Sequence, residues 1–536
     1  MAKSYDLVIR GGRLVDGTGA PPRTADIAIR GDTIADVGAI MPTDETPLLE
    51  ASGLTVTPGL VDAWGAADPL APIFTQPETK LLQGITTEVA GSGGRVPFPL
   101  GEGAGTGLSE DEERLVVPDW TDAKGFLLRV ARAGTAIHRA FFADYGRIRE
   151  LLVGPSDAAL TRDEQRRVAK QISSALEAGC LGLGADLASP PSAYAKTEEI
   201  VELGRILSGA GAVLALGLRD SGPQIEAAVE EAIEIATRSG VEILLPGLRL
   251  GPKPYWGKID WLEKRLARAV YEGVCLTVSI EPYVARVVPL ASLLRPGDRE
   301  GGGKGLADRL ASATGREGIL RSLDARAAGD DDYWSRITLA SREGAEAEAE
   351  GRADHGARPA RTLGDLAAER NRPAAELLLD ILGAEPERKA VLFETNEGNL
   401  ERMLRWDFVT IGSGATARPV RDGRATPPLH PAARGTFARV LRRYVREKKV
   451  LTLEEAVRRM TSLPADRLRL GRKGRIATGY AADITVFRAA AVADRSTYSD
   501  PTLTSHGIDQ VIVKGRFAVR NGEPTGVRAG AVTRRG

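Results

Sequence analysis

Histidine and cysteine are both scarce in this sequence. Its 536 residues include only four histidines and two cysteines. These residues supply most of the zinc ligands in proteins, so the counts argue against a metalloenzyme with a histidine-rich centre. Cys180 and Cys275 each lie in an apolar run. We expect two reduced thiols in the core rather than a disulfide or a metal site.

The chain also lacks an excess of charge and any very long apolar run. Lys and Arg together number 72, as do Asp and Glu, so no net charge draws the protein to nucleic acid or to a membrane surface. No segment approaches the roughly 20 apolar residues of a membrane-spanning helix, and the N-terminus has no signal-peptide core. We expect a soluble, cytoplasmic protein that binds neither nucleic acid nor membrane.

Both ends of the chain have the pattern of β-strands. Short apolar or alternating segments end at turn residues at 5–10, 26–30, 482–487 and 511–515. Asn521-Gly522 adds a strong hairpin signal. Similar patterns at the two ends, around a different middle, predict one small β-sandwich domain built from residues 1–56 and 466–536.

Strands and helices alternate in the middle of the chain. Apolar strands at 212–218, 241–245 and 274–280 recur roughly every 30 residues, and residues 223–239 have helical spacing. This order is typical of βαβ units and a parallel sheet. Together with the length, it favours an α/β fold with a (β/α)8 barrel over residues 57–465, whose functional residues would lie at the C-terminal ends of the strands.

One long stretch, about 286–395, departs from this pattern and is predicted to be an insertion. Within it, residues 343–362 have low complexity, with a Glu-Ala-Glu-Ala-Glu run, and predict a mobile loop. His355 lies in this loop, where we expect it to be solvated.

Several motifs together resemble one enzyme family. They are Thr57-Pro58-Gly59-Leu60-Val61-Asp62, Gly84-Ile85-Thr86-Thr87, Glu281-Pro282-Tyr283, His430-Pro431-Ala432-Ala433 and Gly474-Arg475-Ile476-Ala477-Thr478-Gly479. Nearly the whole chain is similar to the D-aminoacylase, or N-acyl-D-amino-acid deacylase, branch of the amidohydrolase superfamily. The resemblance implies a barrel with a composite β-sandwich, a zinc centre and hydrolysis of linear amides.

The resemblance also locates the positions of that centre. The family's four histidines, bridging cysteine and essential aspartate fall on Trp64, Ala66, Gly93, Gly217, Gly247 and Gly414. None of these side chains can ligate zinc. The family's substrate-binding arginine falls on Ala432. Without metal-activated water and a proton-shuttling carboxylate, amide hydrolysis has no activated nucleophile. We therefore predict no zinc cofactor and no catalytic residues.

Five other residues are candidates for binding a ligand. Arg219 and Arg249 follow Gly217 and Gly247 and would either hold an anion or pair with acidic residues at the rim. Tyr283 matches a segment beside the family's substrate pocket. His138 either faces the pocket or is a hydrogen-bonded core histidine, and His430 is interpreted as structural.

These observations favour a degenerate amidohydrolase, or pseudoenzyme. It would bind a small anionic ligand in the vacated pocket, or act as a structural or regulatory partner of an active protein. The alternative is an N-acyl-D-amino-acid deacylase or a related hydrolase of non-peptide C–N bonds. A second alternative is a metal-free enzyme of new chemistry using Arg219, Arg249 and His138. The sequence leaves open whether the chain forms a homo-oligomer.

Overall fold

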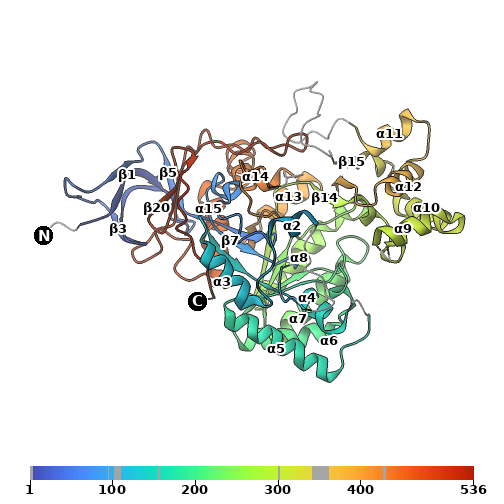
Figure 1. Ribbon diagram of the computed structural model, residues 1–536. Helices are drawn as coiled ribbons and strands as arrows, with labels where there is room; N and C mark the ends of the chain where they lie inside the picture. The colour runs from blue at the N-terminus through green and yellow to red at the C-terminus, as the bar shows by residue number, and fades with distance from the viewer. Residues whose placement is uncertain are drawn as a thin grey trace.

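The computed structural model describes residues 4–94, 96–101, 110–154, 157–299, 302–340, 361–425 and 430–535. Three parts are visible in Figure 1: a sheet domain that contains the N-terminus, a central barrel, and a helical insertion on the opposite side from the sheet. The predicted loop at 343–362 lies outside the described residues except for its last two positions, and so does His355.

The sheet domain joins the two ends of the chain in one nine-stranded sheet. Its order is β21-β20-β19-β18-β5-β1-β2-β3, and β4 pairs with β1. The strands are β1 (Leu7–Leu14), β2 (Arg23–Arg30), β3 (Thr33–Gly38), β4 (Leu48–Glu50), β5 (Thr55–Pro58), β18 (Ile484–Phe487), β19 (Ile508–Val513), β20 (Arg516–Arg520) and β21 (Glu523–Pro524). The antiparallel pairing of β5 with β18 holds the two ends together.

Parallel strands form the barrel. They are β6 (Leu60–Gly65), β7 (Ile85–Ala90), β8 (His138–Phe141) continued by β9 (Ala143–Asp144), β10 (Gly182–Asp186), β11 (Val213–Gly217), β12 (Glu242–Pro246), β13 (Leu276–Ile280) and β17 (Val409–Ile411). Backbone hydrogen bonds close the ring between the segment after β17 and β6, from Gly414 N to Trp64 O at 2.7 Å and from Ala66 N to Ala415 O at 3.1 Å.

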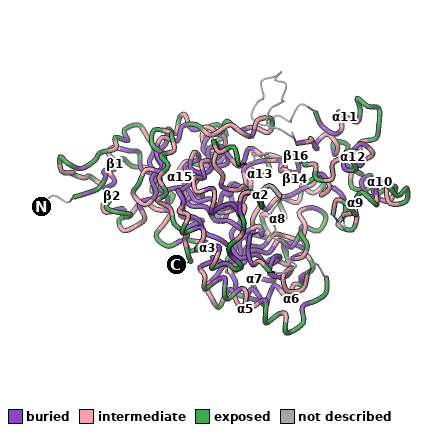
Figure 2. The backbone as a smooth tube through the Cα atoms, viewed as in Figure 1, coloured by how far each residue is buried: buried purple, intermediate pink, exposed green. Residues whose placement is uncertain are grey.

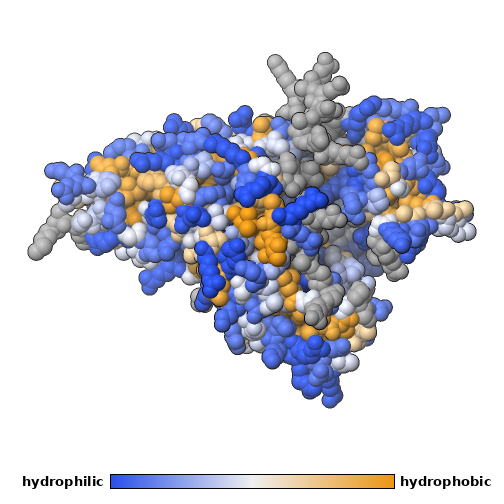
Figure 3. Space-filling model, in the orientation of Figure 1, coloured by the Kyte–Doolittle hydropathy of each residue, from blue (hydrophilic) through white to orange (hydrophobic). Residues whose placement is uncertain are grey.

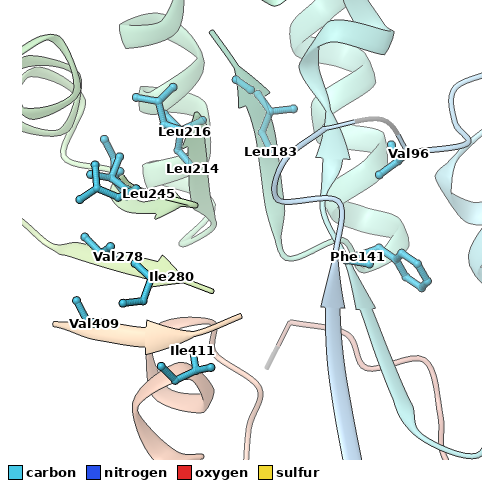
Figure 4. Packing of buried hydrophobic residues seen from close by; sticks show 14 of the residues in the cluster. Val96, Phe141, Leu183, Leu214, Leu216, Leu245, Val278, Ile280, Val409 and Ile411 are labelled. Carbon is cyan, nitrogen blue, oxygen red and sulfur yellow. The ribbon is translucent and has the colours of Figure 1, made fainter. Parts of the chain in front are cut away.

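Alternation along the strands separates the helix-facing side chains from those inside the barrel. One large cluster includes Leu214, Leu216, Leu245, Val278, Ile280, Val409 and Ile411 (Figure 4). The same cluster contains residues of the surrounding helices, so this set faces outwards. The intervening residues Ala215 and Leu244 belong to a second cluster with Val89 and Ala140, which fills the barrel.

Helices between the strands cover the barrel, and its strands are the most continuously buried part of the chain (Figure 2). These helices are α1 (Glu78–Leu81), α2 (Glu110–Leu115), α3 (Ala123–Ala133), α4 (Tyr145–Val153), α5 (Arg162–Ala178), α6 (Thr197–Gly209), α7 (Ile225–Ser239), α8 (Ile259–Tyr271), α13 (Glu397–Leu404), α14 (Ala432–Arg439), α15 (Leu453–Met460) and α16 (Ser462–Arg467). Their ends carry the expected signals. Thr161 and Glu164 form a capping box at the start of α5, and Gly179 ends it with φ 113°.

The insertion has a hydrophobic core of its own. It contains β14 (Ala285–Pro289), β15 (Ile337–Leu339), β16 (Lys389–Phe393), α9 (Gly302–Ala311), α10 (Ala313–Ala327), α11 (Leu363–Glu369) and α12 (Ala374–Ala384). The strands form a small sheet with β16 in the middle. Leu290, Leu323, Leu363 and Leu378 are among its fully buried residues. The two ends of this insertion, near Ala285 and Phe393, return to the mouth of the barrel.

The predicted fold class, a barrel with a β-domain built from both termini, is confirmed. No helix in the described ranges combines the length and the apolar composition that crossing a bilayer requires. On the face shown in Figure 3, hydrophobic residues reach the surface in separate patches between hydrophilic areas.

A buried carboxylate links the barrel to the sheet domain. Asp483, just before β18, has Oδ1 at 3.1 Å from His138 Nε2 and accepts a hydrogen bond from Lys473 Nζ on Oδ2 at 2.6 Å. It also accepts from Lys514 N at 2.9 Å. Burial disfavours the charged form, but His138 and Lys473 hold the pKa of Asp483 well below its usual value.

We predict that Asp483→Asn lowers the free energy of unfolding by about 3 kcal/mol, since it removes the charge that satisfies Lys473 and His138. The loss should persist at neutral pH and shrink only in acid, because the lowered pKa keeps Asp483 ionised above the ordinary aspartate value. Urea denaturation measures the effect. The control is Asp32→Asn in the same domain, where an exposed carboxylate lies 3.3 Å from Lys514 and the expected change is below about 0.5 kcal/mol. Equal losses in both variants would contradict this role for Asp483.

Candidate functional site

The indole ring of Trp64 lies where three of the predicted ligand positions meet. Carbon atoms added as β-carbons at Gly93, Gly247 and Gly414 would lie 3.4, 2.5 and 3.4 Å from the nearest ring atom of Trp64. Ala66 follows two residues later and bonds to the segment that holds Gly414. Gly217 lies at the end of β11 beside Asp186. The mouth of the barrel therefore contains an aromatic ring where the resemblance predicts ligands.

Gly247 and Trp64 depend on each other. Gly247 has φ 66°, a left-handed conformation that favours glycine, and its Cα faces Cη2, Cζ2 and Cζ3 of the indole. A histidine at this position would overlap with the ring. The ring fits only because the residue beside it has no side chain.

These residues do not fit a zinc ion. Zinc needs thiolate, imidazole or carboxylate donors, and the six positions offer an indole, a methyl group and four glycines. No group of three His, Cys, Asp or Glu residues able to hold a metal occurs in the part of the chain that the structure describes. We therefore derive no catalytic step through a metal.

Two acids near the first strand, Asp62 and Asp68, are neutralised by basic side chains. Lys80 Nζ donates to Asp62 Oδ2 at 2.6 Å and to Ser413 Oγ at 2.7 Å, and Arg418 Nε lies 2.8 Å from Asp68 Oδ2. Although burial alone would lower it, Asp62 and Glu88 raise the pKa of Lys80. Because the carboxylates of Asp62 and Asp68 are paired with Lys80 and Arg418, neither is available as a ligand for Mg²⁺ or Ca²⁺.

A small cavity opens where the barrel mouth meets the insertion. Its volume is about 30 Å³. Its walls are formed by Gly247, Leu248, Arg249, Ile280, Glu281, Tyr283, Val284, Ala285, Arg286, Glu394, Thr395, Leu400 and Met403. Trp64 is not one of the lining residues, but it packs against Gly247 from the barrel side. The cavity lies beside the ring rather than in the space that the ring fills.

Four charged side chains line the cavity. Arg286 and Glu394 form a forked ion pair, with Arg286 Nη2 donating to Glu394 Oε1 at 3.0 Å. Within the described residues, neither Arg249 nor the carboxylate of Glu281 makes a hydrogen bond or an ion pair. Burial raises the pKa of Glu281 to about 7, although Arg249 and Arg286 oppose the shift. Burial, together with Arg286, lowers the pKa of Arg249.

The aromatic wall of the cavity is held from behind. Tyr283 lies 5% exposed, and the guanidinium of Arg439 stacks 4.7 Å from the centre of its ring. The hydroxyl of Tyr283 is directed towards Gly435 and has no hydrogen-bond partner in the described structure. Burial, reinforced by Asp494, raises the pKa of Tyr283 well above its usual value, so the residue offers an uncharged surface.

His430 has a structural role next to this wall. Its Nε2 donates to Ala285 O at 2.9 Å, while Nδ1 accepts from Ala432 N at 3.1 Å, so both ring nitrogens are used. The ring meets Tyr283 edge-on at 5.1 Å. Burial lowers the pKa of His430 to about 4, which keeps it neutral. The residue holds the start of α14 against β14.

Two sequence candidates lie away from the cavity. His138 begins β8, at the N-terminal end of the strand, and contacts Asp483 of the sheet domain. Of the two roles considered for His138, the structure shows the hydrogen-bonded core histidine, since the residue is buried and lies at the start of its strand. Arg219 lies at the barrel mouth but donates to Glu231 Oε2 at 2.8 Å and to Ala193 O at 2.8 Å. It does not line the cavity, so only Arg249 of the two arginines does.

Sequence reasoning missed the charged residues of the insertion. Arg286 and Glu394 lie at its two ends, at the boundaries predicted for the stretch 286–395. Glu281 was part of a motif but was assigned no role. The available signal was the pair of opposite charges where the insertion leaves and re-enters the barrel.

We predict that Gly247→Ala destabilises the protein by about 2 kcal/mol, because it adds an atom 2.5 Å from Trp64 at a positive φ. The loss should be smaller in a Trp64→Phe background, since phenylalanine lacks the atoms that would overlap. Urea or thermal denaturation of the four proteins gives the coupling. The control, Gly383→Ala in α12, has nothing within 4 Å of the added atom and should be neutral or stabilising. Additive effects of the Trp64 and Gly247 changes would show that the two residues are independent.

Comparison with known proteins places the chain in a family. Residues 407–519 match the amidohydrolase family. The whole chain aligns with an N-acyl-D-glutamate deacylase at 31% identity and with a D-aminoacylase at 29% identity, both from Alcaligenes xylosoxydans xylosoxydans. Each alignment covers 98% of the relative's own length. Its structure resembles that of the N-acyl-D-glutamate deacylase from Bordetella bronchiseptica complexed with zinc and a phosphonate inhibitor. The TM-score is 0.78 and the identity 27%, covering 99% of this chain and 100% of the other. A further solved structure, of D-aminoacylase, matches 99% of this chain and 100% of its own at 26% identity, with a TM-score of 0.78. The chain belongs to the amidohydrolase family, in its N-acyl-D-amino-acid deacylase branch.

Proposed function

We propose that this chain is a degenerate amidohydrolase that does not hydrolyse amides and instead binds a small anionic ligand at the mouth of its barrel. One observation carries the proposal: the indole of Trp64 packs against Gly93, Gly247 and Gly414, in the space where the family resemblance predicts metal ligands. The cavity lined by Arg249 and Tyr283 supports a binding role.

The chemistry supports the same interpretation. Amide hydrolysis in this superfamily needs a nucleophile at neutral pH, which a metal provides by lowering the pKa of bound water from ~16 to ~7. An indole N–H can donate a hydrogen bond but can neither accept a proton from water nor bind a cation through a lone pair. Asp62 and Asp68, the acids near the first strand, are held by Lys80 and Arg418.

The second candidate is an N-acyl-D-amino-acid deacylase or a related C–N hydrolase. It is favoured by the comparisons, since the 31% identity to an N-acyl-D-glutamate deacylase extends over the whole chain. An identity of this size argues for the fold more strongly than for the reaction, because activity depends on the residues of the site. The interpretation as a metal-free enzyme using Arg219, Arg249 and His138 is less favoured, since only Arg249 of the three lines the cavity.

A role as a structural or regulatory partner of an active protein is the remaining form of the non-catalytic proposal. It would need no occupied cavity. The ligand-binding form is preferred because Arg249 and Glu281 line the cavity and form no hydrogen bond or ion pair with the described side chains.

We predict that purified protein, supplemented with zinc, hydrolyses N-acetyl-D-glutamate, N-acetyl-D-aspartate and N-acetyl-D-methionine no faster than buffer does. Elemental analysis after dialysis should give well below one zinc per chain. Release of free amino acid, measured with protein from a host without deacylases, is the assay. The control is Arg249→Met, which separates activity of this chain from a contaminant. Turnover that is lost in that variant, with near-stoichiometric zinc, would establish the deacylase candidate instead.

A further inference from the structure

Two ionisable side chains of the cavity wall, Arg249 and Glu281, form no hydrogen bond or ion pair with the other described residues. Arg286 and Glu394 neutralise each other in their forked pair. Arg249 comes from the segment after β12 and Glu281 from the segment after β13, and neither makes a hydrogen bond or ion pair within the described residues. Both side chains are half-buried in the cavity wall, where a ligand can supply the hydrogen bonds that the described residues do not.

We propose that the cavity binds a small planar oxyanion between the guanidinium of Arg249 and the carboxyl group of Glu281, which both line it. The inference rests on the proposed non-hydrolytic function and names the chemical class of its ligand. The fork of N–H groups on Arg249 matches two oxygens of a planar anion. A neutral Glu281 adds an O–H donor, which an ionised Glu281 could not provide.

The charges decide which ligand fits. When Glu281 is ionised, the four charged groups of the cavity sum to zero. When Glu281 is protonated, one positive charge is left over, and a monoanion restores neutrality. Among the remaining wall residues, Tyr283 is uncharged, and Leu248, Val284, Leu400 and Met403 are apolar. Asp186 is the other acid that acts electrostatically on Arg249. A dianion would leave an uncompensated buried charge.

The volume limits the size of the ligand. One buried water needs a cavity volume of about 10–15 Å³. The cavity of about 30 Å³ therefore holds roughly two or three water-sized groups. Formate, with three non-hydrogen atoms, is within this range, and acetate and nitrate, with four, are at its upper edge. An N-acyl amino acid is much larger and would need the insertion to move away from the barrel.

Binding should therefore take up a proton near neutral pH. Burial raises the pKa of Glu281 to about 7, against the opposing influence of Arg249 and Arg286. Below this pH the carboxyl is already protonated and the anion binds without further cost. Above it, each pH unit should weaken binding about tenfold, because a proton must be taken up with the anion.

Isothermal titration calorimetry of the full chain with sodium formate, acetate and nitrate at pH 6.0 and 8.5 tests the proposal. Wild-type protein should bind at least tenfold more weakly at pH 8.5 than at pH 6.0. Glu281→Gln, which keeps an N–H donor and cannot ionise, should bind equally at both. Arg249→Met should lose at least tenfold at pH 6.0. Arg219→Met is the control, since this guanidinium lies at the same barrel mouth outside the cavity, and it should bind like wild type.

Comparison of the three anions separates organic from inorganic sources. Binding of formate and acetate but not nitrate would identify a carboxylate ligand, and chloride, which is spherical, should bind poorly in either case. If Arg249→Met binds like wild type, or if wild type and Glu281→Gln share one pH dependence, the proposed site is wrong. Thermal denaturation confirms that each variant is folded before titration.

The outcome also distinguishes this inference from the function on which it rests. Absence of both hydrolysis and oxyanion binding would overturn the ligand class and leave the non-hydrolytic proposal standing. Robust hydrolysis of N-acyl-D-amino acids by the same preparation would overturn the proposed function itself.

Discussion

The packing of one aromatic ring against backbone determines what this barrel mouth can contain. Trp64 reaches the positions of Gly93, Gly247 and Gly414, which belong to three different segments of the barrel. Its own carbonyl accepts the hydrogen bond from Gly414 that helps close the ring of strands. Any side chain at Gly247 would compete with the indole for space. The absence of a side chain at Gly247 and the position of the Trp64 ring are therefore two aspects of the same packing arrangement.

Buried charge is treated differently on the two sides of the barrel wall. Glu88 and Arg139 lie next to Val89 and Ala140, which fill the barrel, so they point to its outer face, where Lys80 joins them. There each charge has an opposite charge close by. At the cavity, neither Arg249 nor Glu281 forms an ion pair with another of the described residues. The first arrangement stabilises the fold, whereas the second supports the proposed binding role.

The fold could be predicted, and the six candidate ligand positions could be assigned by resemblance, because both depend on local sequence. Strand periodicity and the motifs from Thr57 to Gly479 fix the barrel, and Trp64 and Gly414 are recognised from their immediate neighbours. Whether His138 faces the pocket or the core could not be decided, since an apolar run does not show where strand pairing begins. Glu281, Arg286 and Glu394 were missed because their meeting depends on how the insertion returns, which periodicity does not encode.

The forked pair between Arg286 and Glu394 joins residues 108 positions apart, at the two ends of the insertion. The ion pair therefore holds the two ends of the insertion together, and its geometry depends on the hydrophobic core of the insertion. The strands at this pair, β14 and β16, pack on the core of the insertion, where residues such as Leu323 and Leu378 are buried without lining the cavity. A substitution in that core would therefore alter the cavity by shifting Arg286 and Glu394, while every residue of the cavity wall stays the same.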